Sequence, residues 1–257
     1  MSVYESAFVS WAKADDSPVT EADLRADEII VGALRCEFGG VPIISEERQD
    51  FVAGSSTFFL VDPLDGTKEF VLRNGEFTVN IALIVDSEPE AGVVFAPALN
   101  ELFWGARELG AWKGDSRGER PISSGNWRSG GPLRVVGSRS HGGDEMERWL
   151  SLLAVPYEFA ATGSSLKLCR VAEGQAELYP RLGPTMWWDT AAAHSVLREA
   201  GGYMHGITGA PFRYAGFARR NPSFVAYRPG VDVVLPSASR TEAYADVSHR
   251  RQRTRDS

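Results

Sequence analysis

The sequence predicts an α/β fold of the α+β kind, in which a sheet-rich first half precedes a second half of alternating strands and helices. Strand-like apolar runs follow one another from residue 58 to residue 113, with turns between them. From residue 133 to residue 227, strand-like and helix-like runs alternate. Residues 114–132 separate the two patterns and are rich in Gly, Ser, Arg and Pro, which predicts a domain boundary there.

One helix precedes the strands of the first half. Residues 1–14 predict a short amphipathic start, and a loop follows it. Thr20-Glu21-Ala22-Asp23 has the pattern of a capping box, and apolar residues at helical spacing continue to about Phe38, where Gly39-Gly40 ends the helix. Short apolar runs then predict extended segments at residues 41–44, 58–61, 77–85, 92–95, 101–104 and 111–113.

The second half and the tail complete the predicted organisation. The alternation predicts strands at residues 133–136, 157–160, 176–179 and 224–227, and helices at residues 145–153, 165–172 and 188–200. From about residue 229 the periodicity is lost and the chain ends in a basic segment, which predicts a disordered tail. The predicted units are therefore an α+β subdomain of residues 1–132, an α/β subdomain of residues 133–228 and a tail of residues 229–257.

Composition restricts the class of protein. The chain has 257 residues, of which 43% are apolar and 24% charged, as is usual for a soluble globular protein with a large core. Its net charge of −7 argues against binding to nucleic acid but leaves a small anionic ligand open. Cys36 and Cys169 fit a reducing cytoplasm better than a disulfide framework. No run resembles a signal peptide or reaches membrane-spanning length, so we expect a cytoplasmic protein without an integral membrane segment.

The most informative stretch is residues 58–67, where four apolar residues lead into Asp62-Pro63-Leu64-Asp65-Gly66-Thr67. Pro63 disfavours the helical region for Asp62, so the two carboxylates can converge at the end of a buried strand. The glycine turn after them offers free backbone N–H groups, which suit an anion, while the carboxylates suit a hard cation. A simple surface turn would also explain this pattern, because Asp-Pro and Asp-Gly are common in turns.

Further acids lie at the edges of predicted elements. A carboxylate cluster without histidine favours magnesium over zinc, and two such ions can share one site. Each acid has a simpler explanation of its own: Asp23 as a helix cap, Glu46 as a loop acid beside Glu47, and Asp189 as a first-turn acid favoured by the helix dipole. One metal site would explain all of them together. The candidate acids are Asp23, Glu46, Asp62, Asp65 and Asp189.

Several groups in the chain could bind phosphate. Gly66 lets backbone amides approach a phosphate, and Thr67 can orient an attacking water. In the second half, Gly163-Ser164-Ser165-Leu166-Lys167 combines hydroxyls, amides and an ammonium at a helix start, although a serine N-cap explains the serines almost as well. Ser138-Arg139-Ser140-His141 and Tyr179-Pro180-Arg181 add groups that could hold a second phosphate, with Arg181 able to bind it bidentately, or could be solvated surface groups.

An ordered set of motifs covering about residues 13–228 resembles the inositol monophosphatase superfamily. The resemblance is closer to its CysQ branch, the 3′(2′),5′-bisphosphate nucleotidases, and includes residues 163–167 and 179–186. Trp187 stands where that branch often has an acid. The motifs are Asp15-Asp16-Ser17-Pro18-Val19-Thr20-Glu21-Ala22-Asp23, Ser45-Glu46-Glu47, Val61-Asp62-Pro63-Leu64-Asp65-Gly66-Thr67-Lys68-Glu69-Phe70, Arg73-Asn74-Gly75-Glu76-Phe77-Thr78-Val79-Asn80 and Trp188-Asp189-Thr190-Ala191-Ala192.

The resemblance implies a layered αβαβα sugar-phosphatase fold and magnesium-dependent hydrolysis of phosphate monoesters, with lithium inhibition. The substrate it implies is adenosine 3′,5′-bisphosphate, a by-product of sulfate assimilation, which is converted to AMP. Carried over by position, the metal ligands would be Glu46, Asp62, Asp65, Asp189 and the carbonyl of Leu64. Asp23 would help to hold a further magnesium and the nucleophilic water. Gly66 and Thr67 would meet the scissile phosphate, and the nucleotide would contact His141, Ser164, Lys167 and Arg181.

The predicted reaction is direct hydrolysis without a covalent intermediate. A water oriented by Thr67 and by an acid, Glu46 or Asp23, would attack the phosphorus in line, while two or three Mg²⁺ ions neutralise charge. Two alternatives remain: the same chemistry on inositol monophosphate or fructose 1,6-bisphosphate, and a non-catalytic binder of phosphorylated nucleotides. We expect a monomer or a homodimer whose only other partner is its small substrate.

Overall fold

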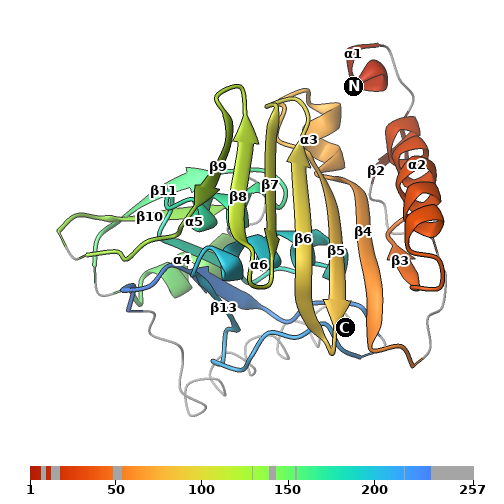
Figure 1. The fold of residues 1–257 in the computed structure, drawn as a ribbon. Coiled ribbons are helices and arrows are strands. Elements are labelled where there is room, and N and C mark those ends of the chain that lie inside the picture. The colour runs from red at the N-terminus through yellow and green to blue at the C-terminus, as the bar shows by residue number, and fades with distance from the viewer. Residues whose placement is uncertain are drawn as a thin grey trace, which may run out of the picture.

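Helices and strands form five layers in the computed structural model, which describes residues 1–6, 10–12, 18–48, 54–128, 130–138, 143–153, 155–216 and 218–232. The order is α2 (Glu21–Glu37), a large sheet, α5 (Leu166–Ala172) with α6 (Trp187–Glu199), a small sheet, and α4 (Gly143–Leu150) (Figure 1). The predicted αβαβα layering is therefore confirmed.

The large sheet has seven strands within the described part of the chain, in the order β3-β4-β5-β6-β7-β8-β9. Only β3 and β4 pair in parallel, and all other neighbours are antiparallel. The sequence misses β9 inside residues 114–132, because Gly-Glu-Arg-Pro-Ile has no alternating apolar pattern. The strands are β3 (Ile43–Ser45), β4 (Thr57–Asp65), β5 (Thr78–Val85), β6 (Glu88–Ala96), β7 (Glu101–Ala106), β8 (Gly110–Asp115) and β9 (Gly118–Ile122).

The small sheet mixes parallel and antiparallel pairs, in the order β11-β10-β12-β14-β13. β12 lies two residues later than predicted and so ends at Arg181. The prediction omits β13, whose four residues follow the glycine pair that ends α6 and lack a strand-like run. The strands are β10 (Leu133–Gly137), β11 (Tyr157–Ala161), β12 (Leu178–Arg181), β13 (Tyr203–Gly206) and β14 (Phe224–Tyr227).

The N-terminal elements are short and precede the predicted helix α2. Tyr4 of α1 (Ser2–Glu5) packs against the rings of Phe70 and Phe77, at 5.0 and 4.9 Å between centroids. β1 (Ser10–Ala12) pairs with β2 (Pro18–Thr20). The capping box that begins α2 is confirmed, since Asp23 accepts from the Thr20 N–H at 2.8 Å. Residues 7–9 and 13–14 of the predicted amphipathic start, residues 15–17 of the predicted loop and residues 233–257 of the predicted tail lie outside the described residues.

Helix α6 lies against the large sheet at unusually short range because two strand residues lack a side chain. A Cβ at Gly92 of β6 would lie 2.3 Å from the Ala192 carbonyl oxygen, and a Cβ at Gly105 of β7 would lie 2.9 Å from the Val196 Cα. Glycine at both positions therefore fixes the depth of α6 in the core between the sheets. This depth matters because the first turn of α6 carries Asp189.

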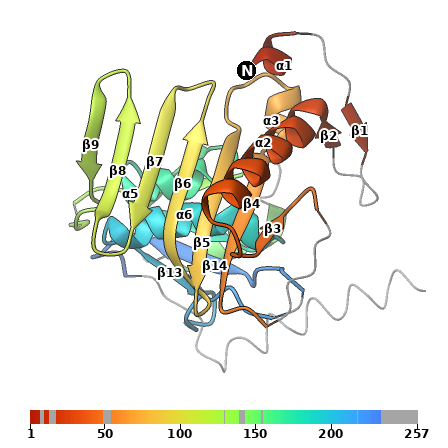
Figure 2. The same cartoon turned by 45° about the vertical axis from the view of Figure 1, so that its right-hand side comes forward.

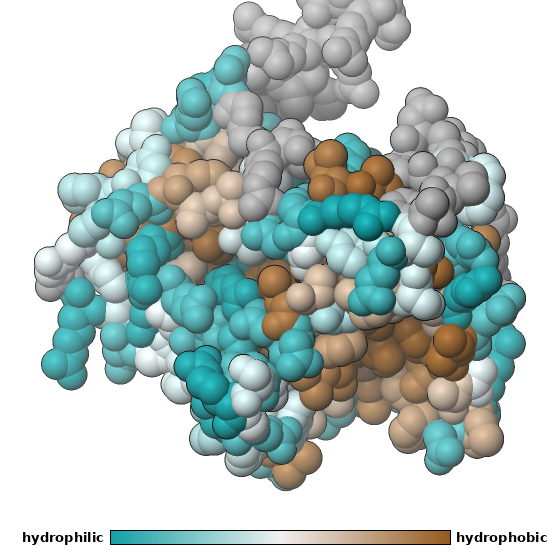
Figure 3. Space-filling view, turned by 90° about the horizontal axis from the view of Figure 1, so that it is seen from above, coloured by the Kyte–Doolittle hydropathy of each residue, from teal (hydrophilic) through white to brown (hydrophobic). Residues whose placement is uncertain are grey.

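The other face of the large sheet is only partly covered. In Figure 2, α2 crosses this face near β4 and β5, whereas α6 lies behind the sheet. Val93 and Phe95 of β6 point away from α6 and are each 38% exposed. Apolar areas also interrupt the otherwise hydrophilic surface in the view of Figure 3. In the described part of the chain, no helix combines the length and the apolar character that crossing a bilayer requires.

Candidate active site

The motif that ends β4 forms a bulge at the C-terminal end of that strand. Asp62 pairs with Asn80 and Asp65 pairs with Thr78, with a shift of register between them. The Leu64 N–H donates to Asp62 Oδ1 at 3.0 Å, which fixes the first carboxylate. Gly66 follows with a φ of +88° and begins the short helix α3 (Thr67–Val71). The predicted convergence of Asp62 and Asp65 therefore arises from a bulge that holds both at one end of the strand.

Three acids from distant parts of the sequence meet beside this bulge. Oxygen atoms of Glu46, Asp62 and Asp189 all lie within 4.8 Å of one another. They come from the turn after β3, from β4 and from the first turn of α6. Burial raises the pKa of Asp62 and Asp189 well above the usual range, and the negative charge of neighbouring carboxylates raises them further.

These three residues fit a divalent cation. Carboxylates that are buried and repel one another are costly as anions unless a cation neutralises them. An all-oxygen set without histidine suits a hard ion such as Mg²⁺. The acids of this cluster are thus a candidate metal site. This agrees with the prediction that acids from separate parts of the sequence contribute to one metal site.

Asp65 lies next to this trio but points its Oδ2 atom at another partner. This oxygen accepts a hydrogen bond at 2.6 Å from the N–H of Ser165, which lies at the start of α5. Burial raises the pKa of Asp65, while the positive charge of Lys167 and the hydrogen bond from Ser165 oppose that rise. One oxygen of Asp65 is thus committed to the protein, which leaves Oδ1 as the atom that could hold a cation.

Asp23 caps α2 with one carboxylate oxygen and faces Thr67 with the other. Its Oδ2 closes the capping box of α2, and its Oδ1 lies 3.4 Å from the Thr67 hydroxyl oxygen. The same hydroxyl lies 3.4 Å from the carbonyl oxygen of Leu64. The structure therefore brings Asp23, Thr67 and the Leu64 carbonyl together beside the bulge.

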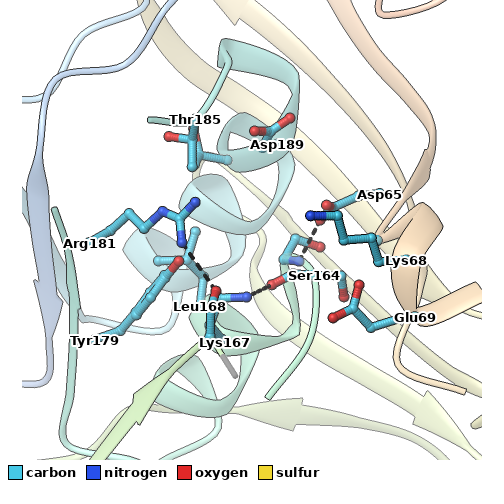
Figure 4. Close-up of a pocket in the computed structure, with 14 residues that line it drawn as sticks. Asp65, Lys68, Glu69, Ser164, Lys167, Leu168, Tyr179, Arg181, Thr185 and Asp189 are labelled. Atoms are coloured by element: carbon cyan, nitrogen blue, oxygen red, sulfur yellow. Dashed lines mark hydrogen bonds between the residues drawn. The ribbon is translucent and has the colours of Figure 1, made fainter. Parts of the chain in front are cut away.

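A cavity of about 140 Å³ opens next to the acids. Figure 4 shows Arg181 and Lys167 on one side of it and Asp65 and Lys68 on the other. Its lining therefore joins anionic groups, which suit a cation, to cationic groups, which suit a phosphate. The lining residues are Asp65, Gly66, Lys68, Glu69, Ser138, Ser164, Ser165, Lys167, Leu168, Tyr179, Arg181, Thr185, Asp189 and Thr190.

Lys167 is a buried ammonium at this cavity, with 5% of the residue exposed. Its Nζ donates to the carbonyl oxygens of Ser164 at 2.6 Å and Thr162 at 3.3 Å, and lies 5.6 Å from the centre of the Tyr179 ring. Burial lowers the pKa of Lys167 to about 8, although the charge of Asp65 acts in the opposite direction. An anion in the cavity would therefore stabilise the charged form of Lys167.

Arg181 reaches the cavity from the end of β12. Its Nη1 donates to the Ser138 hydroxyl at 3.1 Å and its Nη2 to the Pro184 carbonyl at 3.0 Å. These two bonds fix the plane of the guanidinium, the orientation on which bidentate recognition of a phosphate depends.

The structure brings most of the predicted site residues together. Glu46, Asp62 and Asp189 form the trio, Asp23 and Thr67 are adjacent, and His141 lies outside the described residues. The cavity is lined by the predicted Asp65, Gly66, Ser164, Lys167, Arg181 and Asp189.

Sequence reasoning assigned no role to some of the lining residues. Lys68 and Glu69 could have been found, because they follow Gly66-Thr67 in the first turn of α3. Thr185 and Thr190 carry no local signal, since they reach the cavity through the packing of α6 and of the segment just before it. Trp187 is a core residue that stacks on Phe58 at 6.2 Å between ring centroids and does not line the cavity.

Comparison with known proteins agrees with this geometry. The model of the inositol monophosphatase family matches residues 2–232. The chain is 47% identical over 210 residues to the 3′(2′),5′-bisphosphate nucleotidase CysQ of Escherichia coli K12, which covers 79% of this chain and 82% of the relative. It is 40% identical over 206 residues to the CysQ nucleotidase of Buchnera aphidicola, with 79% and 76% covered.

Solved structures of the same family are also similar to this chain. The crystal structure of CysQ from Bacteroides thetaiotaomicron matches with a TM-score of 0.77 and 36% identity, covering 90% of this chain and 92% of that one. An inositol monophosphatase from Anabaena matches with a TM-score of 0.70 and 25% identity, covering 82% of each chain. The chain belongs to the inositol monophosphatase family.

Proposed function

We infer that this protein is a 3′(2′),5′-bisphosphate nucleotidase that hydrolyses the 3′-phosphate of adenosine 3′,5′-bisphosphate to give AMP. The observation that carries this inference is a cavity whose lining joins Asp65 and Asp189 to Lys167 and Arg181. A bisphosphate needs one group of residues to hold the reacting phosphate near cations and another to hold the second phosphate. The 47% identity to a nucleotidase of this specificity supports the choice of nucleotide.

The proposed cofactor is Mg²⁺, in two or three ions. Bound Mg²⁺ would neutralise the charge on the phosphate oxygens and favour the hydroxide form of a water. The crowding of carboxylate oxygens in the trio supports this assignment. The residues proposed to hold the ions are Glu46, Asp62, Leu64 through its carbonyl, Asp65 and Asp189, with Asp23 contributing to a further one.

The proposed roles of the other residues follow from their positions. Gly66 and the first turn of α3 present backbone N–H groups to the reacting phosphate. The Thr67 hydroxyl can donate to Asp23 or to the Leu64 carbonyl, which leaves its oxygen free to accept a hydrogen bond from the attacking water. Glu46 or Asp23 then accepts that water's other proton, which gives direct in-line attack.

The nucleotide is proposed to occupy the rest of the cavity. Lys167 and Arg181 lie across the cavity from Asp65 and Lys68 (Figure 4), and Ser164 also lines it, so the reacting phosphate would lie beside the acids and the second phosphate beside Lys167 and Arg181. His141 is proposed as a further contact from the sequence alone. We also propose a cytoplasmic location, which is supported by the free thiols of Cys36 and Cys169, and a monomeric or homodimeric state.

Release of inorganic phosphate tests this function. The purified protein is assayed with Mg²⁺ on adenosine 3′,5′-bisphosphate, inositol monophosphate and fructose 1,6-bisphosphate, with an EDTA-treated sample as the control. We expect the nucleotide to have the highest kcat/KM and the EDTA sample to release no phosphate. The nucleotide assignment is wrong if adenosine bisphosphate is the poorest of the three, and nucleotide binding without phosphate release would identify a non-catalytic binder.

A further inference from the structure

A ring of four polar side chains borders the cavity, and the two that lie behind it, Thr78 and Asn80, have no part in the roles proposed above. Thr78 and Asn80 of β5, which are fully and almost fully buried, face Asp65 and Ser165. The Ser165 hydroxyl lies 2.7 Å from Asn80 Oδ1 and 2.8 Å from the Thr78 hydroxyl. Asn80 Nδ2 and the Thr78 hydroxyl each lie 3.5 Å from Asp65 Oδ2. The ring therefore connects the end of β4, the middle of the large sheet and the start of α5.

The direction of each hydrogen bond in this ring follows from the charge of Asp65. A carboxylate only accepts, so the amide nitrogen of Asn80 must face Asp65, and Asn80 Oδ1 must face Ser165. The Ser165 hydroxyl then donates to Asn80 Oδ1, so its oxygen accepts the single hydroxyl proton of Thr78 at 2.8 Å, and Thr78 does not also donate to Asp65. Replacing the Asn80 carboxamide by an apolar group would remove one buried partner from the Ser165 hydroxyl and one from Asp65.

The ring sets the distance between two parts of the proposed site. Ser165 directly follows Ser164, which lines the cavity in a left-handed conformation with φ of +48°. The Ser164 carbonyl in turn holds the ammonium of Lys167 at 2.6 Å. On the other side, the Ser165 N–H holds Asp65 Oδ2 at 2.6 Å. Moving Ser165 would thus move both the residues that face the nucleotide and the carboxylate proposed to face a cation.

We propose that Asn80 is a positioning residue, which holds the start of α5 and the Asp65 carboxylate in a fixed relative position through the Ser165 hydroxyl. Asn80 does not line the cavity and so acts through its neighbours rather than on the ligand. Its carboxamide suits this task because it donates to a carboxylate on one side and accepts from a hydroxyl on the other. The inference rests on the proposed function for the choice of nucleotide.

The test measures binding of each ligand alone by isothermal titration calorimetry, on wild type, Asn80→Ala, Ser165→Ala and the double variant. AMP is titrated in EDTA, and Mg²⁺ is titrated without nucleotide. We expect Asn80→Ala to weaken AMP binding about tenfold, as the loss of one well-placed buried hydrogen bond does. We expect Mg²⁺ binding to weaken by about tenfold as well, as is typical when a group that orients a metal ligand is removed.

Two features separate positioning from simple destabilisation. Ser195→Ala is the matched control, because Ser195 is also a fully buried serine, with its hydroxyl donating to the Gly105 carbonyl at 3.0 Å. It should bind AMP and Mg²⁺ like wild type. Asn80 and Ser165 act through one shared hydrogen bond. The double variant should therefore bind AMP and Mg²⁺ with about the same affinity as whichever single variant has the lower affinity.

Several outcomes would overturn the proposal. It is wrong if folded Asn80→Ala binds both ligands within about twofold of wild type, or if the effects of Asn80→Ala and Ser165→Ala multiply in the double variant. If Asn80→Ala does not fold, the AMP and Mg²⁺ affinities of Ser165→Ala decide the proposal instead. That variant keeps the hydrogen bond from the backbone N–H of residue 165 to Asp65. If wild type binds Mg²⁺ but not AMP, the nucleotide function is wrong, and the Mg²⁺ titrations alone decide the role of Asn80.

Discussion

Lys167 provides the sharpest test of the electrostatics of the cavity, because its charge is buried and its pKa is lowered. In the folded protein the pKa is about 8, against 10.5 for an ordinary lysine. Between these values the unfolded chain binds more protons than the folded one, so the free energy of unfolding rises as the pH increases. Below pH 8 both states carry the proton, and the folded state bears a penalty of about 3 kcal/mol for the buried charge.

The magnitude between two convenient pH values follows from the same two pKa values. Raising the pH from 7 to 9.5 should remove about 2 kcal/mol of this penalty in wild type. Lys167→Met keeps a side chain of similar length without the charge, so it should lack this gain. Urea unfolding of the metal-free protein at both pH values measures the difference. Lys68→Met, which removes an exposed lysine at the same cavity, is the control and should behave like wild type.

The affinity for an anionic ligand should depend on pH in the opposite direction to the free energy of unfolding. The affinity for AMP should fall as the pH rises above about 8, because the ammonium that faces the anion loses its proton. Lys167→Met should bind AMP about 10- to 100-fold more weakly at pH 7, as expected for the loss of a charge-assisted hydrogen bond, and should lack this pH dependence. The reasoning is refuted if wild type and Lys167→Met show the same change in unfolding free energy between pH 7 and 9.5.

Three further predictions concern the acids, the arginine and the core. Asp65→Asn should lower phosphate release by more than about 100-fold with an unchanged circular dichroism spectrum, because a neutral amide is a poor cation ligand; near-normal turnover would exclude Asp65 as a ligand. Arg181→Lys should raise KM about tenfold with kcat little changed, because one ammonium cannot bind a phosphate bidentately; an unchanged KM would remove Arg181 from the substrate contacts. Gly92→Ala should destabilise the protein by about 1–3 kcal/mol in urea unfolding, because its Cβ would lie 2.3 Å from the Ala192 carbonyl oxygen. Gly32→Ala, in a helix with open space around it, should instead stabilise by up to about 1 kcal/mol, and equal effects at the two glycines would contradict the packing argument.

Local sequence determines the parts of this protein whose physical causes are local. The capping box at Thr20 and Asp23 begins α2 because its partners are three residues apart. The apolar run before Asp62 becomes a strand covered on both faces, and the glycine at position 66 turns the chain into α3. The chemical types of the acids, lysine and arginine also follow from the sequence alone, together with their suitability for Mg²⁺ and phosphate.

Tertiary structure decides which of these groups meet. Asp189 joins Glu46 and Asp62 only because Gly92 and Gly105 let α6 lie deep against the large sheet. The contact of Asn80 with Ser165 depends on packing between β5 and the start of α5, 85 residues apart, which no local pattern encodes. Strands β9 and β13 are likewise extended because a neighbouring strand pairs with them, since their own residues carry little strand signal. The identity of a residue determines the chemistry of its side chain, whereas the packing of the whole chain determines the distance between two side chains.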